Sequence, residues 1–173
     1  MTKITPKLVI AALMAASIAA VTLFLRVPIP KSGGYLNLGD ILVIFCGAYL
    51  GPLYGALAGG IGSAVADAVG YPIFIIPTLI IKGLEGFIPG LLQRRGFRLI
   101  GCFVGAGVMV VGYYFAEDFV FAGKIGHAAA VTELPFNLIQ GMVGASGGYL
   151  LSKVINRLSE EQRDDDAKNE AST

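Results

Sequence analysis

The sequence contains no tryptophan, a single histidine and only two cysteines among its 173 residues. Charged residues make up 14% of the chain, against about 25% in an average soluble domain. The two cysteines, Cys46 and Cys102, show none of the spacings typical of a metal site, and we read them as small core residues. A net charge of +1 gives no general attraction for nucleic acid. These shortages argue against an ordinary soluble domain, a metal site and a nucleic-acid partner.

Long apolar runs take the place of these missing groups. The hydrophobic class reaches 55% of the residues, and the mean hydropathy is +0.72. Because a helix that crosses a bilayer needs about 20 predominantly apolar residues, a chain of this length can cross several times. We therefore expect an all-α polytopic membrane protein.

Six transmembrane helices account best for these runs. The run from Asp40 to Val69 would be roughly 45 Å long as one helix, whereas the hydrocarbon core is about 30 Å thick. Proline tends to end or kink a helix, so Gly51-Pro52 should divide the run into a short second helix and a longer third one. The short second helix could also tilt or be partly re-entrant. The six expected helices cover residues 8–25, 40 to about 51, 52–69, 73–92, 99–115 and 130–155.

The distribution of basic residues predicts that both termini are cytoplasmic. Cytoplasmic loops of membrane proteins carry an excess of Lys and Arg. Six helices place most basic residues near the membrane on the inner side, whereas five would move the cluster at residues 94–98 outside. We expect one transmembrane domain over residues 1–158, followed by a charged, disordered cytoplasmic tail over residues 159–173. The inner residues are Lys3, Lys7, Arg94, Arg95, Arg98, Lys153 and Arg157, against Arg26, Lys31 and Lys124 outside.

Small residues recur every four positions in two of the expected helices, as in Gly51, Gly55 and Gly59 of the third. Such faces let helix backbones approach closely, which drives helix association in lipid. They serve either packing inside this bundle or docking of a separate membrane subunit, and the sequence leaves both open. The first helix carries two adjacent stripes of this kind, one formed by Ala11, Ala15 and Ala19 and the other by Ala12, Ala16 and Ala20.

A polar stripe lies within the expected sixth helix. Glu133, Asn137 and Gln140 have the spacing i, i+4, i+7, which places them on one helix face, with Gly144 extending it. Ionisable groups at membrane depth are costly unless they face an interior or a cavity. The stripe is therefore either a site for a small polar ligand or a structural hydrogen-bond network.

Further polar residues occur in other expected helices and in the first loop. Lys82 and Glu85 can form an i, i+3 ion pair, or Lys82 can reach an anionic group. Asp40 begins the second helix, where a carboxylate favourably caps the N-terminus. Tyr35 and Asn37 lie in the first outer loop, which can act as a lid.

Five motifs follow one another in a fixed order along the chain. They are Tyr35-Leu36-Asn37-Leu38-Gly39-Asp40, Gly51-Pro52-Leu53-Tyr54-Gly55, Asp67, Lys82-Gly83-Leu84-Glu85-Gly86 and Pro135-Phe136-Asn137-Leu138-Ile139-Gln140. With these motifs the chain resembles the S components of energy-coupling factor (ECF) vitamin transporters, in the riboflavin-transporter-like branch that includes proteins for pyridoxine-type and hydroxymethylpyrimidine-type substrates. The resemblance covers about residues 8 to 157.

The resemblance implies a subunit of a plasma-membrane importer of bacterial type. Such a subunit captures a vitamin from outside and acts with a transmembrane coupling subunit and two cytoplasmic ATPases. It implies no cofactor, no metal and no enzymatic activity, and the coupling subunit docks on the alanine stripes of the first helix. By position, the implied ligand-binding residues are Asn37, Lys82, Glu85, Tyr113, Glu133, Asn137 and Gln140.

The expected ligand is a small aromatic heterocycle, with pyridoxine or a thiamine pyrimidine precursor favoured and riboflavin next. Tyrosine and phenylalanine would stack on the ring, and amide and carboxylate groups would bind its polar atoms. Two other functions stay open. A stand-alone carrier would use Glu85 and Glu133 as proton sites, and a structural membrane protein would bind no ligand.

Overall fold

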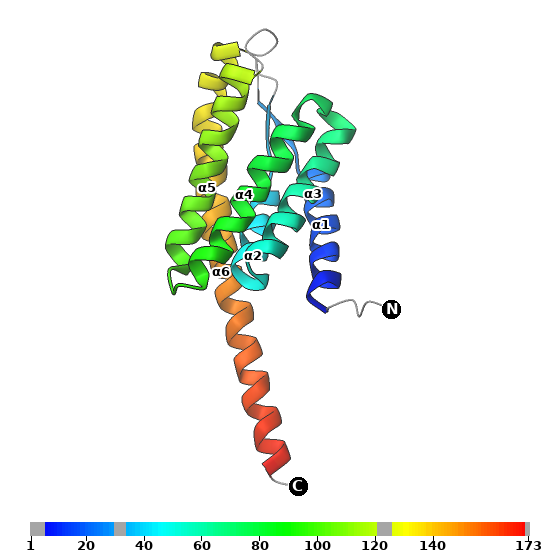
Figure 1. The fold of residues 1–173 in the computed structure, drawn as a ribbon, viewed down its shortest axis with the longest axis vertical. Coiled ribbons are helices and arrows are strands. Elements are labelled where there is room, and N and C mark those ends of the chain that lie inside the picture. The colour runs from blue at the N-terminus through cyan, green and yellow to red at the C-terminus, as the bar shows by residue number, and fades with distance from the viewer. Residues whose placement is uncertain (1–5, 30–33, 121–125, 172–173) are drawn as a thin grey trace.

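The computed structural model describes residues 6–29, 34–120 and 126–171. Six α-helices run alternately up and down, and the N-terminal end of the first helix and the C-terminal end of the last lie on the same side of the bundle (Figure 1). The predicted all-α architecture is confirmed, apart from two short paired strands. The elements are α1 (Pro6–Phe24), β1 (Val27–Pro28), β2 (Tyr35–Leu36), α2 (Gly39–Leu50), α3 (Pro52–Gly70), the 3-10 turn η1 (Pro72–Phe74), α4 (Ile75–Gln93), α5 (Arg98–Phe115), the π-helical turn η2 (Ala116–Val120) and α6 (Gly126–Ala171).

Four helical segments of the described chain are long and apolar enough to cross a membrane. They are α1, α3, the η1–α4 segment Pro72–Gln93 and the α5–η2 segment Arg98–Phe119. Helix α2 has 12 residues, which at 1.5 Å per residue gives roughly 18 Å. The buried polar residues Glu133, Asn137 and Gln140 interrupt the apolar part of α6. Large apolar side chains are exposed around the bundle, as expected for helices that face lipid.

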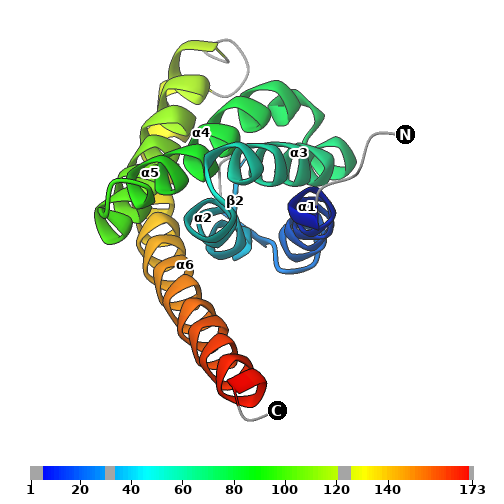
Figure 2. The ribbon, with the colours of Figure 1, turned by 60° about the horizontal axis from the view of Figure 1, so that its bottom comes forward.

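The break between α2 and α3 lies at the predicted dipeptide. Gly51 has φ of 102°, a conformation that favours glycine, and Pro52 is at the first position of α3, where its missing N–H costs no helical hydrogen bond. Helix α2 lies at the centre of the bundle and contacts α1, α3, α4 and α6 (Figure 2). The short second helix is therefore a core element.

Glycines allow α2, α3 and α4 to touch backbone to backbone. A Cβ added at Gly47 or Gly55 would overlap the carbonyl oxygen of Gly86. Without these side chains the helices approach closely enough for extensive van der Waals contact, which is the main attraction between helices in lipid. The small-residue face of the third helix is thus used inside the bundle. Nearby, Cys46 and Cys102 are free and fully buried, in agreement with their interpretation as core residues.

The C-terminal part of the chain differs from the expected disordered tail. Helix α6 continues without interruption to Ala171, and its charged half projects beyond the other helices (Figure 1). Glu, Arg, Lys and Ala favour helices, and extending an existing helix avoids the cost of nucleation. Arg163 donates to the carbonyl oxygen of Ser159, and Lys168 pairs with Asp165, so local contacts support the extension.

Candidate functional site

A small polar cavity lies between the β1–β2 segment, helices α3, α5 and α6, and the turns η1 and η2. Its volume is about 30 Å³. The short strands hold Tyr35 and Leu36 beside the residues that follow α1, because Val27 pairs with Leu36 and Pro28 with Tyr35. The segment therefore forms one wall of the cavity. The cavity is lined by Gly34, Tyr35, Asn37, Asp67, Phe74, Tyr113, Glu117, Glu133, Asn137 and Gln140.

Two glutamates that line this cavity interact with each other. Glu133 comes from α6, and Glu117 comes from η2, the turn that continues α5. Their side chains are almost completely buried, with exposed fractions of 3% and 1%. One oxygen of each, Oε1 of Glu133 and Oε2 of Glu117, has no hydrogen-bond partner among the described residues. The site thus holds buried acceptors that its own side chains leave unsatisfied.

The first loop packs directly on one of these carboxylates. A Cβ added at Gly34 would overlap the carboxylate of Glu133. The absence of a side chain at Gly34 therefore allows the loop backbone to cover the glutamate. This position of the segment agrees with the expectation that the loop can act as a lid.

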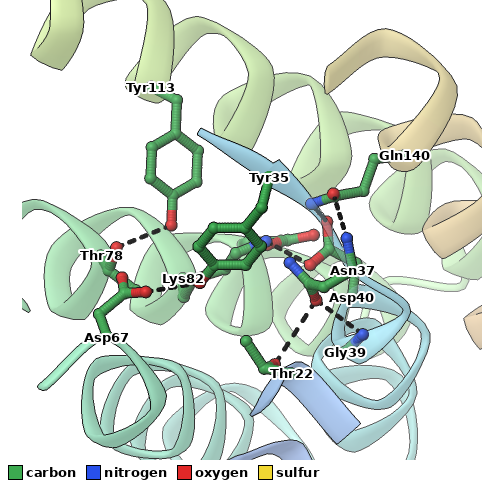
Figure 3. A network of polar contacts seen from close by, with 11 residues as sticks. Thr22, Tyr35, Asn37, Gly39, Asp40, Asp67, Thr78, Lys82, Tyr113 and Gln140 are labelled. Carbon is green, nitrogen blue, oxygen red and sulfur yellow. Dashed lines mark hydrogen bonds and ion pairs between the residues drawn. The ribbon is translucent and has the colours of Figure 1, made fainter. Parts of the chain in front are cut away.

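Aromatic residues also line the site. Tyr35 donates a hydrogen bond to Asp67, and burial together with that carboxylate raises the pKa of the Tyr35 phenol, so the hydroxyl stays protonated (Figure 3). The guanidinium of Arg26 lies 4.4 Å from the centre of the Tyr35 ring and donates to the carbonyl oxygen of Ala66. Tyr113 and Thr78 share a hydrogen bond of 2.8 Å. Two tyrosines are thereby held in fixed orientations at the cavity.

A chain of polar contacts leads from the lid into the centre of the bundle (Figure 3). The backbone N–H of Asn37 donates to Oε1 of Gln140 at 2.8 Å, and Nε2 of Gln140 donates to Asp40 at 2.9 Å. Lys82 forms ion pairs with Asp40 and with Glu85, the second at 2.8 Å. Gln140 thus connects the lid to a buried ionic cluster built from α2 and α4.

Asp40 differs from its predicted role as a helix cap. The N-cap of α2 is Leu38, which makes no side-chain cap hydrogen bond, and Asp40 instead points inward to Lys82 and Gln140. Asp40 still lies in the first turn of α2, where the helix dipole favours a negative charge. The predicted pair of Lys82 and Glu85 is confirmed, and the anionic group that Lys82 also reaches belongs to the protein itself.

Five of the seven predicted ligand-binding residues line the cavity: Asn37, Tyr113, Glu133, Asn137 and Gln140. The other two, Lys82 and Glu85, lie in the buried ionic cluster and do not line it. Sequence reasoning placed Tyr35 in the lid but did not include it in the site, and it missed Asp67, Phe74 and Glu117 there. The signal for Asp67 was its charge within an apolar helix.

The structure separates the two alanine stripes of α1. Ala11 and Ala19 are buried and Ala15 is half-buried, and the backbone of Ala15 approaches Gly62 of α3. The residues of the other stripe, Ala12, Ala16 and Ala20, are all exposed. One stripe is therefore used inside the bundle, whereas the other leaves a smooth outer surface.

The structure is that of a helical membrane protein with a small polar cavity beneath its first loop. The family model described as "ECF-type riboflavin transporter, S component" matches residues 3–157, and the chain belongs to this family. A protein of Pyrococcus woesei described as "Uncharacterized protein in gap 3'region" is 38% identical over 152 residues, which cover 83% of this chain and 100% of that protein. Members of the family are transporter subunits that capture vitamins with partner subunits, and are not enzymes.

Proposed function

We propose that this protein captures a small aromatic heterocyclic vitamin or vitamin precursor in the cavity under the first loop. The observation that carries the proposal is the set of buried, unsatisfied carboxylate oxygens on Glu117 and Glu133, next to the ring of Tyr113. Aromatic walls bind a flat ring, and a few polar groups fix its orientation, as is typical of small-molecule sites.

The size of the cavity favours a small ligand and requires the lid to move. Ligand pockets usually enclose about 300–1,000 Å³, far more than the cavity of about 30 Å³. A single-ring vitamin such as pyridoxine or the thiamine pyrimidine precursor needs less outward movement of the lid than the three-ring riboflavin. We therefore place the single-ring compounds first. In this proposal Asn37, Asn137 and Gln140 contact the ligand. Lys82 and Glu85 do not contact it, but they stabilise Asp40, to which Gln140 donates a hydrogen bond.

Six crossings with cytoplasmic termini fit this function. The helices alternate in direction, and the α4–α5 turn, with Arg94, Arg95 and Arg98 at or beside it, lies at the end of the bundle that also holds the N-terminal end of α1 (Figure 1). Excess positive charge marks the cytoplasmic side. The cavity then opens outward in the plasma membrane, where the vitamin arrives. Of the basic residues counted on the two sides, Lys3 on the inner side and Lys31 and Lys124 on the outer side lie outside the described residues.

The ligand can be identified by native mass spectrometry of the purified protein after expression in rich medium. We expect a bound mass that matches a B vitamin or a precursor. Glu133→Ala or Asn137→Ala should weaken binding of that compound at least several-fold without loss of the fold. A purified protein that carries no small molecule and binds none of a panel of vitamins would contradict the proposal and favour a carrier or a structural role.

We further propose that the exposed stripe of α1 docks the transmembrane coupling subunit, which acts with two ATPases. Replacing both Ala12 and Ala16 by Leu adds bulk to this outer face and should spare ligand binding but prevent co-purification with the coupling subunit. The matched control is Leu13→Ala, which removes bulk from a neighbouring exposed position. An intact complex with the double variant would refute this docking face.

A further inference from the structure

The side chain of Arg26 connects the end of α1 with the last turn of α3. Arg26 lies between α1 and β1, and its Nη2 donates to the carbonyl oxygen of Ala66 at 3.3 Å. Gly70, the last residue of α3, leaves room for this contact, because a Cβ added there would overlap Nη1 of Arg26. A cation near the C-terminal end of a helix also interacts favourably with the helix dipole. The guanidinium is thereby fixed at this end of α3.

The same guanidinium lies over two tyrosine rings. Its central carbon is 4.4 Å from the ring centre of Tyr35 and 4.9 Å from that of Tyr71, and the two ring centres are 4.8 Å apart. Arg26 is half-buried, and its Nε is buried without a hydrogen-bond partner among the described residues. The attraction between a cation and an aromatic face increases when the cation is desolvated. Arg26, Tyr35 and Tyr71 therefore form one cluster, which we call the Arg26 clamp.

Tyr35 is the member of the clamp that lines the cavity, whereas Arg26 and Tyr71 lie behind it. The clamp holds the ring of Tyr35, and Asp67 accepts a hydrogen bond from its hydroxyl group. The strands themselves contribute little, because the β1–β2 pairing comprises only two residues of each strand, and isolated two-stranded pairings are marginally stable. The position of Tyr35 in the cavity wall thus depends on contacts with α3 and with the residue that follows it.

We infer that Arg26 is a positioning residue of the ligand site, an inference that rests on the proposed function. Arg26 does not contact the ligand and acts through Tyr35. Its planar guanidinium stacks on the rings and donates to Ala66 at the same time, which a lysine ammonium cannot do. The contact keeps Tyr35 and the adjoining strand β2 on α3, so that this side of the cavity stays closed around a bound molecule.

A substitution outside the clamp separates this role from a contribution to overall stability. Gly70→Ala removes no group of the clamp but places a Cβ where the end of Arg26 lies, whereas alanine favours the helix itself. We expect hydrogen–deuterium exchange of backbone amides at Tyr35 and Leu36 to become at least ten-fold faster, without a fall in the thermal unfolding temperature in detergent. Gly107→Ala, whose Cβ would meet no atom within 4 Å, is the matched control and should leave exchange unchanged.

Variants of the clamp itself test the same role directly on the full-length protein without a ligand. Arg26→Gln and Tyr71→Leu should each accelerate exchange in β2 at least ten-fold, whereas Tyr71→Phe keeps the aromatic face and should behave as the wild type. Unchanged exchange in both Arg26→Gln and Tyr71→Leu would overturn the inference. Faster exchange along the whole chain would show a general stabilising contact and would overturn it as well. Gly70→Ala decides the question if Arg26→Gln does not fold.

Ligand kinetics separate failure of this inference from failure of the proposed function. The probes are pyridoxine, 4-amino-5-hydroxymethyl-2-methylpyrimidine and riboflavin. For a probe that binds the wild type, Arg26→Gln should raise the dissociation rate at least ten-fold and change the association rate less, because Tyr35 no longer closes its side of the cavity. An unchanged dissociation rate would overturn the inference while leaving vitamin capture intact. If no probe binds the wild type, vitamin capture fails, whereas the exchange measurements still decide whether Arg26 positions Tyr35.

Discussion

Two acidic clusters lie close together in this bundle and differ in how their charges are satisfied. In the inner one, Asp40 and Glu85 are paired with Lys82, and Gln140 donates to Asp40. In the outer one, Glu117 and Glu133 line a cavity and keep unpartnered oxygens. Both clusters are buried and contain two carboxyl groups each, but only the inner one includes a lysine. Burial of charge therefore does not by itself distinguish a structural cluster from a ligand site.

The comparison of the two clusters shows that the presence of a basic partner is more informative than burial. The inner cluster contains its own counter-charge and links helices, whereas the described residues that line the outer cluster supply no basic side chain. The inner cluster connects α2, α4 and α6 through side chains alone. The outer cluster lies against the loop at Gly34, so the ligand proposed above reaches it from the loop side. Gln140 belongs to both, because it lines the cavity and also bonds to Asp40.

The largest effect is expected when the inner cluster loses its counter-charge. Lys82→Met leaves Asp40 and Glu85 buried without a cation, and breaking a buried pair typically costs about 3–5 kcal/mol. We expect a large drop in thermal unfolding temperature in detergent, or loss of the folded protein. Lys153→Met, at an exposed position of α6, serves as the control and should change stability little. Equal shifts for the two variants would show that the inner cluster is not structural.

A smaller, more selective effect is expected at the outer cluster. Gly34→Ala places a Cβ where the Glu133 carboxylate lies, and the flexible end of that side chain can move away. Stability should therefore persist while ligand affinity falls at least ten-fold, or about 1.4 kcal/mol. The matched control is Gly107→Ala, because a Cβ there meets no atom within 4 Å. Unchanged affinity in Gly34→Ala would mean that Glu133 need not hold its observed position.

The smallest effect is expected from removing the projecting end of α6. Deletion of residues 159–173 removes exposed charged side chains that contact neither cluster. We expect ligand affinity to stay the same, with a change in stability within about 0.5 kcal/mol. Calorimetry and thermal unfolding check both. A clear loss of affinity would show that the outer cluster depends on the far end of this helix.

Helix boundaries and the polar stripe were accessible from the sequence because both depend on local patterns. Gly51-Pro52 marked the break between α2 and α3, and the i, i+4, i+7 spacing placed Glu133, Asn137 and Gln140 on one buried face. Non-local contacts were not accessible in this way. The position of Asp40 predicts a helix cap, yet its side chain points into the bundle, where it forms an ion pair with Lys82, 42 residues away in the sequence.

Two further differences between the sequence-based prediction and the structure have local causes that amino-acid composition alone does not indicate. Glu117 and Asp118 lie between the predicted helices 99–115 and 130–155, but a π-helical turn continues α5 and places Glu117 at the cavity. The residues after Ser159 read as disordered because they are highly charged. Their helix-forming side chains nevertheless extend a helix that is already formed. In both cases a preceding helix decides the conformation of residues that would be ambiguous alone.

The burial of both cysteines has a practical consequence. Cys46 and Cys102 have no exposed surface, so reagents that modify thiols cannot reach them in the folded protein. A cysteine introduced at an exposed position would therefore react alone, without removal of the native pair. A fluorophore at such a site in the projecting part of α6, and a spin label in the lid in a second variant, would report motion during transport. Labelling of the native cysteines would in turn indicate that the bundle has opened.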